Sequence, residues 1–386
     1  MAIQNLSEDL LMEILWRLPV KSLLQSKSAC KNWYALIQNP IFISLHHDRA
    51  AGRNTDCLLV KRALDGSNGK IILSFVHEET PVEDIDISFT GLDIEKLQLL
   101  GPCNGVVCLT RLASNSTIVI CNPSIREFRV LPQPSHKVGY LANLGFGFDQ
   151  YTNDYKVVKF GYLDPDFKTW LDDGRIEIYE LSTDSWREVD AVSPVKFDFF
   201  CYYSTCASWN GDFYWYACCY GGDAAIIVFN MTDEMFDELP LPEVCLLDNC
   251  SERDLFILND TLALVIYPGG WIPSLRPSGA RYFSLKKCFH VWVMDKHGDE
   301  VSWTKFFSIG PLEKPNFSLG FRKNGECLLE CGDGQMMSYN RDTQQMKEYQ
   351  VFGHEPPHCL QVLLYTESLV TVKRHNDRDE TDDLHV

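Results

Sequence analysis

YELSTDSWRE, residues 179–188, is the stretch that decides the fold, because its pattern recurs along the chain. Its residues Tyr179, Thr183, Trp186 and Glu188 have counterparts at Phe229, Asp233, Phe236 and Glu238, and again at Tyr339, Thr343, Met346 and Glu348. Looser copies start at Cys121, Phe148 and Met294. Each copy has the composition of a strand, a polar turn and a second strand whose bulky residue points back into the sheet. We therefore predict a recurring β-hairpin.

The sequence around these copies is also typical of an all-β domain. From about residue 56 onward, short β-branched and aromatic runs such as AAIIVF (224–229) alternate with Gly, Asn, Asp and Pro. One such hairpin is about half of a four-stranded propeller blade. With blades of about 40 to 50 residues, the roughly 330 residues available predict a β-propeller of six or seven blades.

The first fifty residues have a helical pattern instead. An amphipathic helix is predicted over residues 7–18, capped by Ser7 and ended by Pro19, with one apolar face made by Leu10, Leu11, Ile14, Leu15 and Leu18. Shorter helices are predicted over residues 21–30 and 32–38, before Pro40 ends the run, and His46 and His47 are expected at a solvated helix terminus. So small a unit buries little surface, so its apolar stripe is expected to lean on a partner or on the domain behind it.

The charge of the chain is concentrated outside this helical region. The formal net charge is -18, and residues 1–50 hold five basic and four acidic side chains, which leaves -19 on the remainder. Such a surface repels phosphate backbones and anionic membranes. We therefore expect no nucleic-acid or membrane partner, and we expect attraction to basic proteins.

The fifteen cysteines are predicted to be free, structural thiols. Their number is odd, they are scattered along the chain, and no close pair has the two-residue spacing of a zinc ribbon. No metal and no cofactor is therefore predicted. The N-terminus carries Glu8 and Asp9 where a secretory signal has positive charge, so a cytoplasmic location is expected, with a nuclear fraction also allowed.

At the N-terminus the residues match a known motif. Residues 6–46, LSEDLLMEILWRLPVKSLLQSKSACKNWYALIQNPIFISLH, resemble the plant F-box motif along their whole length. The motif usually opens Leu-Pro and carries Val before its Cys, whereas this chain has Leu6 followed by Ser7, and Ala29 before Cys30. Ser7 lacks the fixed backbone angle that proline gives to the start of the motif. The departure therefore implies a somewhat reduced affinity for the adaptor protein that this motif binds in the family.

The remainder resembles the F-box-associated, kelch-like domain of flowering plants, and within it is most similar to the S-locus F-box group. The segments that carry this resemblance are GPCNGVVCLT (101–110), NPSIREFRVLP (122–132), LGFGFDQYTNDYKVVKF (144–160), IEIYELSTDSWREVD (176–190) and FHVWVMDKHGDEVSWTKFFSIGPL (289–312). The predicted organisation is a small all-α F-box module at residues 1–50, an all-β propeller at 51–374 and a disordered acidic tail at 375–386.

The resemblance implies a substrate receptor of a Skp-cullin-F-box ubiquitin ligase. In that family the F-box binds a Skp-type adaptor, and through it cullin, while the C-terminal domain holds a protein substrate for ubiquitination and proteasomal degradation. For S-locus members the substrate is a secreted, basic S-ribonuclease of the style, and destruction of non-self variants allows cross-compatible pollination. The residues expected at the adaptor face or packed behind it are Leu6, Leu10, Ile14, Leu18, Pro19, Leu23, Leu24 and Trp33.

Three segments of irregular composition are candidates for reading the substrate. They are Leu163–Gly174, Ala217–Asp223 and Pro268–Arg281. Loops can vary on a rigid scaffold without unfolding it, and Trp is common at binding hot spots. The residues expected to contact substrate are Asp164, Asp166, Trp170, Asp172, Asp173 and Trp271. The alternative, that these segments are only spacers, stays open.

Two other function classes are alternatives to a ubiquitin-ligase receptor. An enzyme is not favoured, because the chain has no nucleophile elbow, no His-Glu-x-x-His and no phosphate loop. A propeller that only scaffolds partners would not need residues 6–40 in their order, and adaptor co-purification separates it from a ubiquitin-ligase receptor. A receptor for a different plant protein also remains an alternative.

Overall fold

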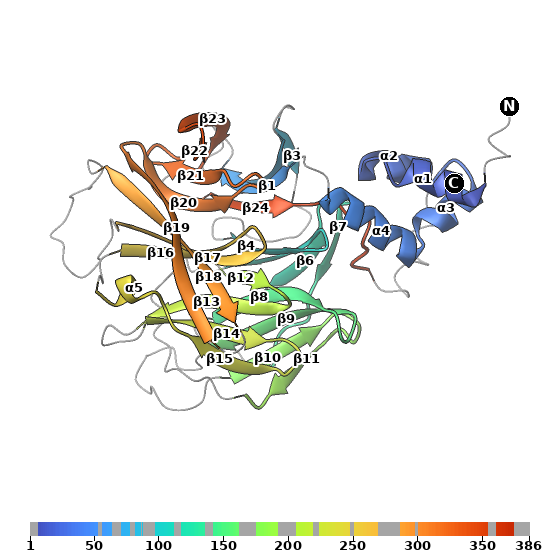
Figure 1. Cartoon of the computed structure of the whole chain (residues 1–386). Coiled ribbons are helices and arrows are strands. Elements are labelled where there is room, and N and C mark those ends of the chain that lie inside the picture. Colours follow the sequence, from blue (N-terminus) through green and yellow to red (C-terminus); the bar gives the residue numbers. More distant parts are fainter. Residues whose placement is uncertain are drawn as a thin grey trace.

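The structure is a computed structural model of the whole chain. It describes residues 7–52, 56–63, 71–77, 82–85, 87, 97–111, 117–135, 142–161, 175–191, 206–218, 224–247, 251–268, 286–297, 300–353 and 360–373. A helical module, residues 7–52, lies to one side of a ring of β-sheets (Figure 1). The predicted order of a small helical unit followed by a propeller is confirmed.

The helical module contains α1 (Glu8–Leu15), α2 (Val20–Ser26), α3 (Lys31–Ile37) and α4 (Pro40–Ala51). The prediction that Pro40 ends the helical run was wrong, because Pro40 is the first residue of α4. Proline is tolerated in the first turn, where its missing N–H has no helical partner. Asn39 caps this helix, since its side chain accepts a hydrogen bond from the Ile41 N–H at 2.8 Å.

The described residues form six four-stranded antiparallel sheets, so the six-bladed form of the predicted propeller is confirmed. Blade 1 is β24 (Gln361–Tyr365), β1 (Cys57–Ala63), β2 (Ile71–His77) and β3 (Glu83–Ile85); blade 2 is β4 (Leu97–Cys103), β5 (Val106–Arg111), β6 (Ile118–Asn122) and β7 (Glu127–Val130); blade 3 is β8 (Ala142–Asp149), β9 (Asp154–Gly161), β10 (Arg175–Glu180) and β11 (Ser185–Val189). Blade 4 is β12 (Ala207–Trp209), β13 (Asp212–Cys218), β14 (Ala224–Asn230) and β15 (Met235–Leu239); blade 5 is β16 (Ser251–Leu258), β17 (Thr261–Pro268), β18 (Lys287–His297) and β19 (Glu300–Leu312); blade 6 is β20 (Pro315–Phe321), β21 (Cys327–Cys331), β22 (Gln335–Asn340) and β23 (Gln345–Phe352). A short helix, α5 (Glu243–Leu247), follows blade 4.

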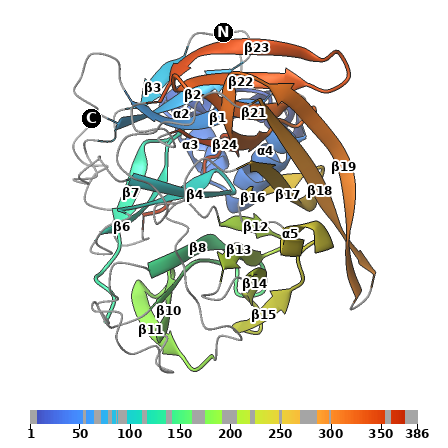
Figure 2. The same cartoon turned by 90° about the vertical axis from the view of Figure 1, so that its left-hand side faces the viewer.

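The ring is closed by strands from both ends of the chain. In blade 1 the last strand, β24, pairs with the first, β1, in a register that sets Tyr365 opposite Cys57. The innermost strands of the six blades are β24, β4, β8, β12, β16 and β20. Each contacts the innermost strand of both neighbouring blades, so these six strands surround the axis of the ring (Figure 2). Closure by non-adjacent strands removes the open edges that a linear array of sheets would leave.

The recurring hairpins of the sequence are the outer halves of the blades. Tyr179 pairs with Trp186, and the equivalent pairs are Phe229 with Phe236 and Tyr339 with Met346. The looser copies at Cys121 and Met294 are also outer hairpins. The copy at Phe148 differs, because it joins the two inner strands of blade 3. One turn geometry therefore serves two places in a blade.

Adjacent blades pack face to face through apolar side chains. Six buried clusters lie between the blades, one for each pair of neighbours. Trp residues of outer strands join the blades further: the indole N–H of Trp186 donates to the Pro132 carbonyl at 2.7 Å, and that of Trp303 donates to the Pro240 carbonyl at 2.8 Å. Each bond satisfies a buried or half-buried indole across a blade boundary.

The two faces of the propeller differ in the connections they carry. The hairpin face, defined here by the turns at 103–106, 122–127, 149–154, 180–185 and 230–235 and their equivalents, is the face on which the helical module sits. The loop face is the opposite side, where the second strand of each blade ends and the third begins. Figure 2 views the ring from the loop face, with the helices behind it.

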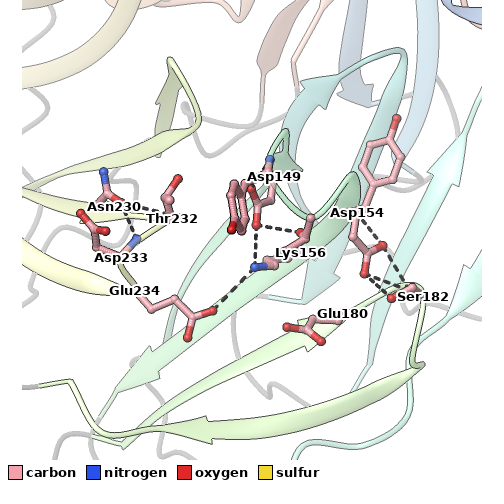
Figure 3. Close-up of polar contacts among 12 residues, drawn as sticks. Asp149, Asp154, Lys156, Glu180, Ser182, Asn230, Thr232, Asp233 and Glu234 are labelled. Carbon is pink, nitrogen blue, oxygen red and sulfur yellow. Dashed lines mark hydrogen bonds and ion pairs between the residues drawn. The ribbon is translucent and has the colours of Figure 1, made fainter.

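A group of ionic side chains joins blades 3 and 4 at the hairpin face (Figure 3). The Lys156 ammonium, whose side chain is 4% exposed, lies 2.7 Å from the Asp149 carboxylate and 3.6 Å from that of Glu234. Arg187 bonds to Glu234 and, at 3.0 Å, to Glu180. Removing either partner of such a buried ion pair destabilises the fold, because the remaining charge is left buried without an opposite charge.

This group gives a testable dependence of stability on pH. Burial raises the pKa of Asp149, but the hydrogen bonds from Lys156, Thr152 and the Tyr151 N–H outweigh it and lower the pKa to about 2. A carboxyl whose pKa is lower in the folded state stabilises the fold above its unfolded pKa, and the stabilisation is lost as pH falls through the folded value. The Asp149→Asn variant should therefore be less stable than wild type at pH 6, and the gap should shrink between about pH 4 and pH 2.

Thermal unfolding of both proteins over this pH range measures the effect. Asp342→Asn is the control, because Asp342 lies in the outer hairpin turn of blade 6 and its side chain is 82% exposed. A gap between Asp149→Asn and wild type that stays constant with pH would contradict the prediction.

Candidate partner-binding surfaces

The first candidate surface lies on the helical module, where α1 presents apolar residues to solvent. Leu10 is 54% exposed and Ile14 is 48% exposed, and they follow each other by one helical turn. Leu11 and Leu15, one position later, are buried in the core of the module. The predicted apolar face of α1 is therefore divided into a buried part, Leu11 and Leu15, and an exposed part, Leu10 and Ile14. The buried part contributes to the core of the module, and the exposed part is available to a partner.

The other residues predicted for this surface occupy different environments. Leu23 is fully buried, and Leu18, Leu24 and Trp33 are partly buried against the same core. Pro19 is exposed and caps α2. Leu6 lies outside the described residues. The structure thus places Leu10, Ile14 and Pro19 at the surface, and the other described residues behind it.

Three exposed apolar residues of the module were not singled out from the sequence. Ile41 is 67% exposed, and Tyr34 and Leu45 are each 38% exposed. Ile41 and Leu45 repeat the arrangement of α1, because the next residues, Phe42 and His46, are buried. The spacing of four residues between Ile41 and Leu45 is the signal of a helix face, and the prediction that the helical run ends at Pro40 obscures this signal.

Helices α1 and α4 are held together at the edge of this surface by charge. The Arg49 guanidinium lies 4.0 Å from the ring centroid of Trp16 and 3.6 Å from the Glu13 carboxylate. Glu13 also accepts a hydrogen bond from the Trp16 indole at 3.2 Å. These contacts fix the crossing of the two helices that carry the exposed apolar pairs.

The histidines of α4 lie at a buried position rather than at a solvated terminus, so that expectation was wrong. His46 is 2% exposed, and its Nε2 is 2.9 Å from the Leu18 carbonyl. Burial lowers the pKa of His47, against the opposing effect of the Glu367 backbone. Helix α4 is solvated on one side only, because its other side packs on the module and the propeller.

The second candidate surface is the loop face. The strand ends Gly161 and Arg175, Cys218 and Ala224, and Pro268 and Lys287 all lie on it, in three consecutive blades. They flank the three segments predicted to read substrate. Asp164, Asp166, Trp170, Asp172, Asp173 and Trp271 themselves lie outside the described residues.

Near the loop face, blade 5 carries polar side chains on its inner strands. The Tyr267 hydroxyl donates to the Asp254 carboxylate at 2.7 Å, and burial raises the pKa of Asp254 to about 7. The Lys287 ammonium donates to the Asn316 carbonyl at 2.9 Å, and burial lowers its pKa. The first bond lies within blade 5 and the second joins blade 5 to β20 of blade 6, and both satisfy groups that burial would otherwise penalise.

The thiols do not form a reactive or metal-binding centre in the part of the chain that the structure describes. Ten cysteines there are free thiols, and burial raises the pKa of Cys103 to about 11 and that of Cys121 to about 12. Thiols held in the protonated form are poor nucleophiles and poor ligands. No cluster of three or more His, Cys, Asp or Glu suited to a metal ion occurs among the described residues. In the same residues, each helix is too short or too polar to cross a membrane.

Two family models match this chain. The model of the F-box domain matches residues 3–45, and the model of the F-box associated beta propeller domain matches residues 70–372. The first match covers α1 to α3 and the start of α4, and the second covers most of the propeller. Together they include both candidate surfaces.

Two plant proteins are similar to this chain over most of its length. F-box/kelch-repeat protein At3g17530 of Arabidopsis thaliana is 27% identical over 313 residues, covering 79% of this chain and 76% of its own length. F-box protein At3g07870 of the same plant is 26% identical over 370 residues, covering 86% of this chain and 82% of its own length. Among solved structures, TolB from Acinetobacter baumannii is 12% identical and covers 81% of this chain and 70% of that chain, with a TM-score of 0.40.

Proposed function

Because this chain belongs to the plant F-box proteins that carry an F-box associated beta propeller domain, we propose that it recruits a basic protein, of the S-ribonuclease class, for ubiquitination. An F-box joined to a propeller is the substrate-recognition subunit of an SCF-type ligase. The F-box domain binds the Skp-type adaptor and, through it, cullin. The identity of the substrate is the part that we propose.

The observation that carries the proposal is the placement of the two candidate surfaces on opposite faces of one propeller. The exposed apolar pair Leu10 and Ile14 belongs to the module on the hairpin face. The strand ends that flank the irregular segments meet on the loop face. An adaptor on the module therefore leaves the loop face open to a second protein, as a receptor requires.

The charge of the chain supports a basic substrate. Residues 1–50 carry +1 of the total of -18, so the remaining residues carry -19. Such a surface speeds the association of a basic protein and adds ion pairs at the rim of the interface. Resemblance to the S-locus F-box group supplies a class of substrate with this charge, and degradation of its non-self members in the cytoplasm of pollen tubes is the role we propose.

This proposal predicts a strong effect of salt on the association rate. Between about 0.01 M and 0.15 M ionic strength the screening length falls from about 30 Å to about 8 Å, so the rate of association with basic ribonucleases should fall markedly. Neutralising Asp164, Asp166, Asp172 and Asp173 together should lower the rate at low salt for every ribonuclease tested. Surface-immobilised binding kinetics with several basic ribonucleases measure both effects.

Dissociation should behave differently from association. Buried apolar contact is not screened, so the dissociation rate should change less with salt, and Trp271→Ala should change the ranking of the ribonucleases. Asp342→Asn is a suitable charge control, because Asp342 lies on the hairpin face. Association that ignores both salt and the four Asp changes would contradict a basic substrate.

A second candidate is a receptor for a different plant protein. The specific support for it is that the segments of this chain that match the S-locus group also occur in F-box proteins with other substrates. A quantitative pulldown from style extract separates the two candidates, since only the first predicts enrichment of S-ribonucleases.

A further inference from the structure

We propose that residues 366–373, the C-terminal strap, lock the helical module onto the propeller and so fix the direction in which the adaptor site points. The strap follows β24 and lies on the hairpin face, between the module and blade 2. The structure describes no helix or strand within it. Its position is instead set by two buried apolar side chains and a series of hydrogen bonds.

The strap is bound firmly to blade 2. The Asn122 amide donates to the Ser368 carbonyl at 3.0 Å and to the Val370 carbonyl at 2.8 Å. The Glu127 carboxylate accepts from the Thr371 hydroxyl at 2.6 Å and from the Val372 N–H at 3.2 Å. A side-chain amide and a carboxylate thus take the place of the missing strand partner for an irregular backbone.

Val372 also anchors the strap in the propeller core. Its side chain is fully buried in the apolar cluster between blades 2 and 3. Before the strap begins, the Tyr365 hydroxyl donates to the Gly105 carbonyl at 2.9 Å. The strap is therefore held at both ends, and its middle residues have little freedom.

The middle of the strap reaches the module. Leu369 is 4% exposed and belongs to the core of the module, together with Leu11, Leu15, Leu23 and Phe42. The propeller gives a second side chain to this core, Ile125 of the β6–β7 turn, which is partly buried. The core of the module is thus completed by the domain behind it, as expected for so small a unit.

Two charged side chains, one in the strap and one in blade 6, hydrogen-bond to helix ends of the module. The Glu367 carboxylate accepts from the Val20 N–H at 3.3 Å, at the N-terminus of α2. The Lys323 ammonium of blade 6 donates to the Ala51 carbonyl at 2.8 Å, at the C-terminus of α4. Negative charge at a helix N-terminus and positive charge at a C-terminus are both favourable, so the two helices are held at opposite ends.

The consequence concerns ubiquitin transfer, and this step alone rests on the proposed function. The rest of the ligase approaches the substrate from the adaptor, so a module with one fixed orientation holds the substrate at one place relative to the incoming ubiquitin. Leu369 is in this sense a positioning residue. It contacts neither of the candidate partner-binding surfaces.

Hydrogen–deuterium exchange of the full chain with its Skp-type adaptor bound tests the inference without any substrate. Leu369→Asp places a charge in the shared core, so exchange of the α2 amides and of the strap should rise about ten-fold or more. Exchange in β14 and β17, in blades 4 and 5, should stay unchanged, because the apolar clusters of these strands contain no strap residue. Lys373→Asp is the control, because Lys373 is the exposed end of the same strap, and Leu369→Met should restore protection.

Each outcome of this experiment either supports or overturns the role of the strap. If α2 in Leu369→Asp exchanges at the rate seen in Lys373→Asp, the strap does not hold the module and the inference is overturned. If Leu369→Asp unfolds the whole chain, Glu367→Ala decides instead, since it removes only the acceptor of the Val20 N–H: faster exchange at α2 supports the inference, and no change overturns it. Loss of adaptor binding with α2 protection intact would count against the proposed function and not against the strap.

Discussion

Replacing Leu10 and Ile14 together by Asp is expected to abolish co-purification with the Skp-type adaptor while the propeller stays folded. Both side chains are exposed in the chain alone, so the new carboxylates are solvated and cost the fold little. In the complex they would be buried against apolar surface, which costs several kcal/mol, or a loss of affinity of about 100-fold or more. Pulldown of the adaptor, with circular dichroism of the variant, measures both parts.

A matched control uses exposed apolar residues elsewhere. Tyr151 is 86% exposed and Met235 is 64% exposed, and both lie on turns of the hairpin face in blades 3 and 4. The double variant Tyr151→Asp, Met235→Asp adds the same charge at a distance from the module and should bind the adaptor as wild type does. Retention of the adaptor by the Leu10 and Ile14 variant would exclude α1 as the contact.

A large loss of stability is expected for Gly105→Ala. Gly105 has a φ of +75°, and a Cβ there would lie 2.3 Å from the Ser368 Cβ and 2.8 Å from the Thr366 carbonyl oxygen. The left-handed backbone costs an alanine about 1 kcal/mol, and relief of the overlap requires the strap to move, for a total of about 3 kcal/mol or more. Thermal unfolding measures the change.

Gly211 supplies the control for this substitution. It occupies the same position of the same two-residue turn in blade 4, with a φ of +85°, and a Cβ there would meet no atom within 4 Å. Gly211→Ala should therefore cost only the backbone term, about 1 kcal/mol. Equal losses in the two variants would mean that the strap does not press on Gly105.

Most of the fold could be predicted from local patterns in the sequence. The pairing of Tyr179 with Trp186 and of its equivalents lies within ten residues, so strand, turn and partner can all be read from one short stretch. The same holds for α1, where Ser7 caps the helix and accepts a hydrogen bond from the Leu10 N–H at 3.4 Å. The outer hairpins account for one blade each in blades 2 to 6, and blade 1, which joins both ends of the chain, has no copy of the pattern.

Features that depend on distant residues could not be predicted in this way. Leu369 joins a core whose other buried members all lie before residue 43, and nothing in the sequence around it marks that contact. The division of the apolar face of α1 into a buried and an exposed part has the same cause, since Leu10 and Leu11 differ only in what packs on them. For the candidate site, sequence alone placed Leu10 and Ile14 on α1 but could not tell them from Leu23, which is internal.

The closure of blade 1 by β24 and β1 also constrains how the protein is made. About 300 residues separate Cys57 from its partner Tyr365, which at 5 to 20 residues per second is roughly 15 to 60 s of ribosomal synthesis. During that interval the helical module has been synthesised, but Leu369, which belongs to its core, has not. A chain that terminates early lacks both the closing strand and the strap, so it cannot present an adaptor site fixed against a finished propeller.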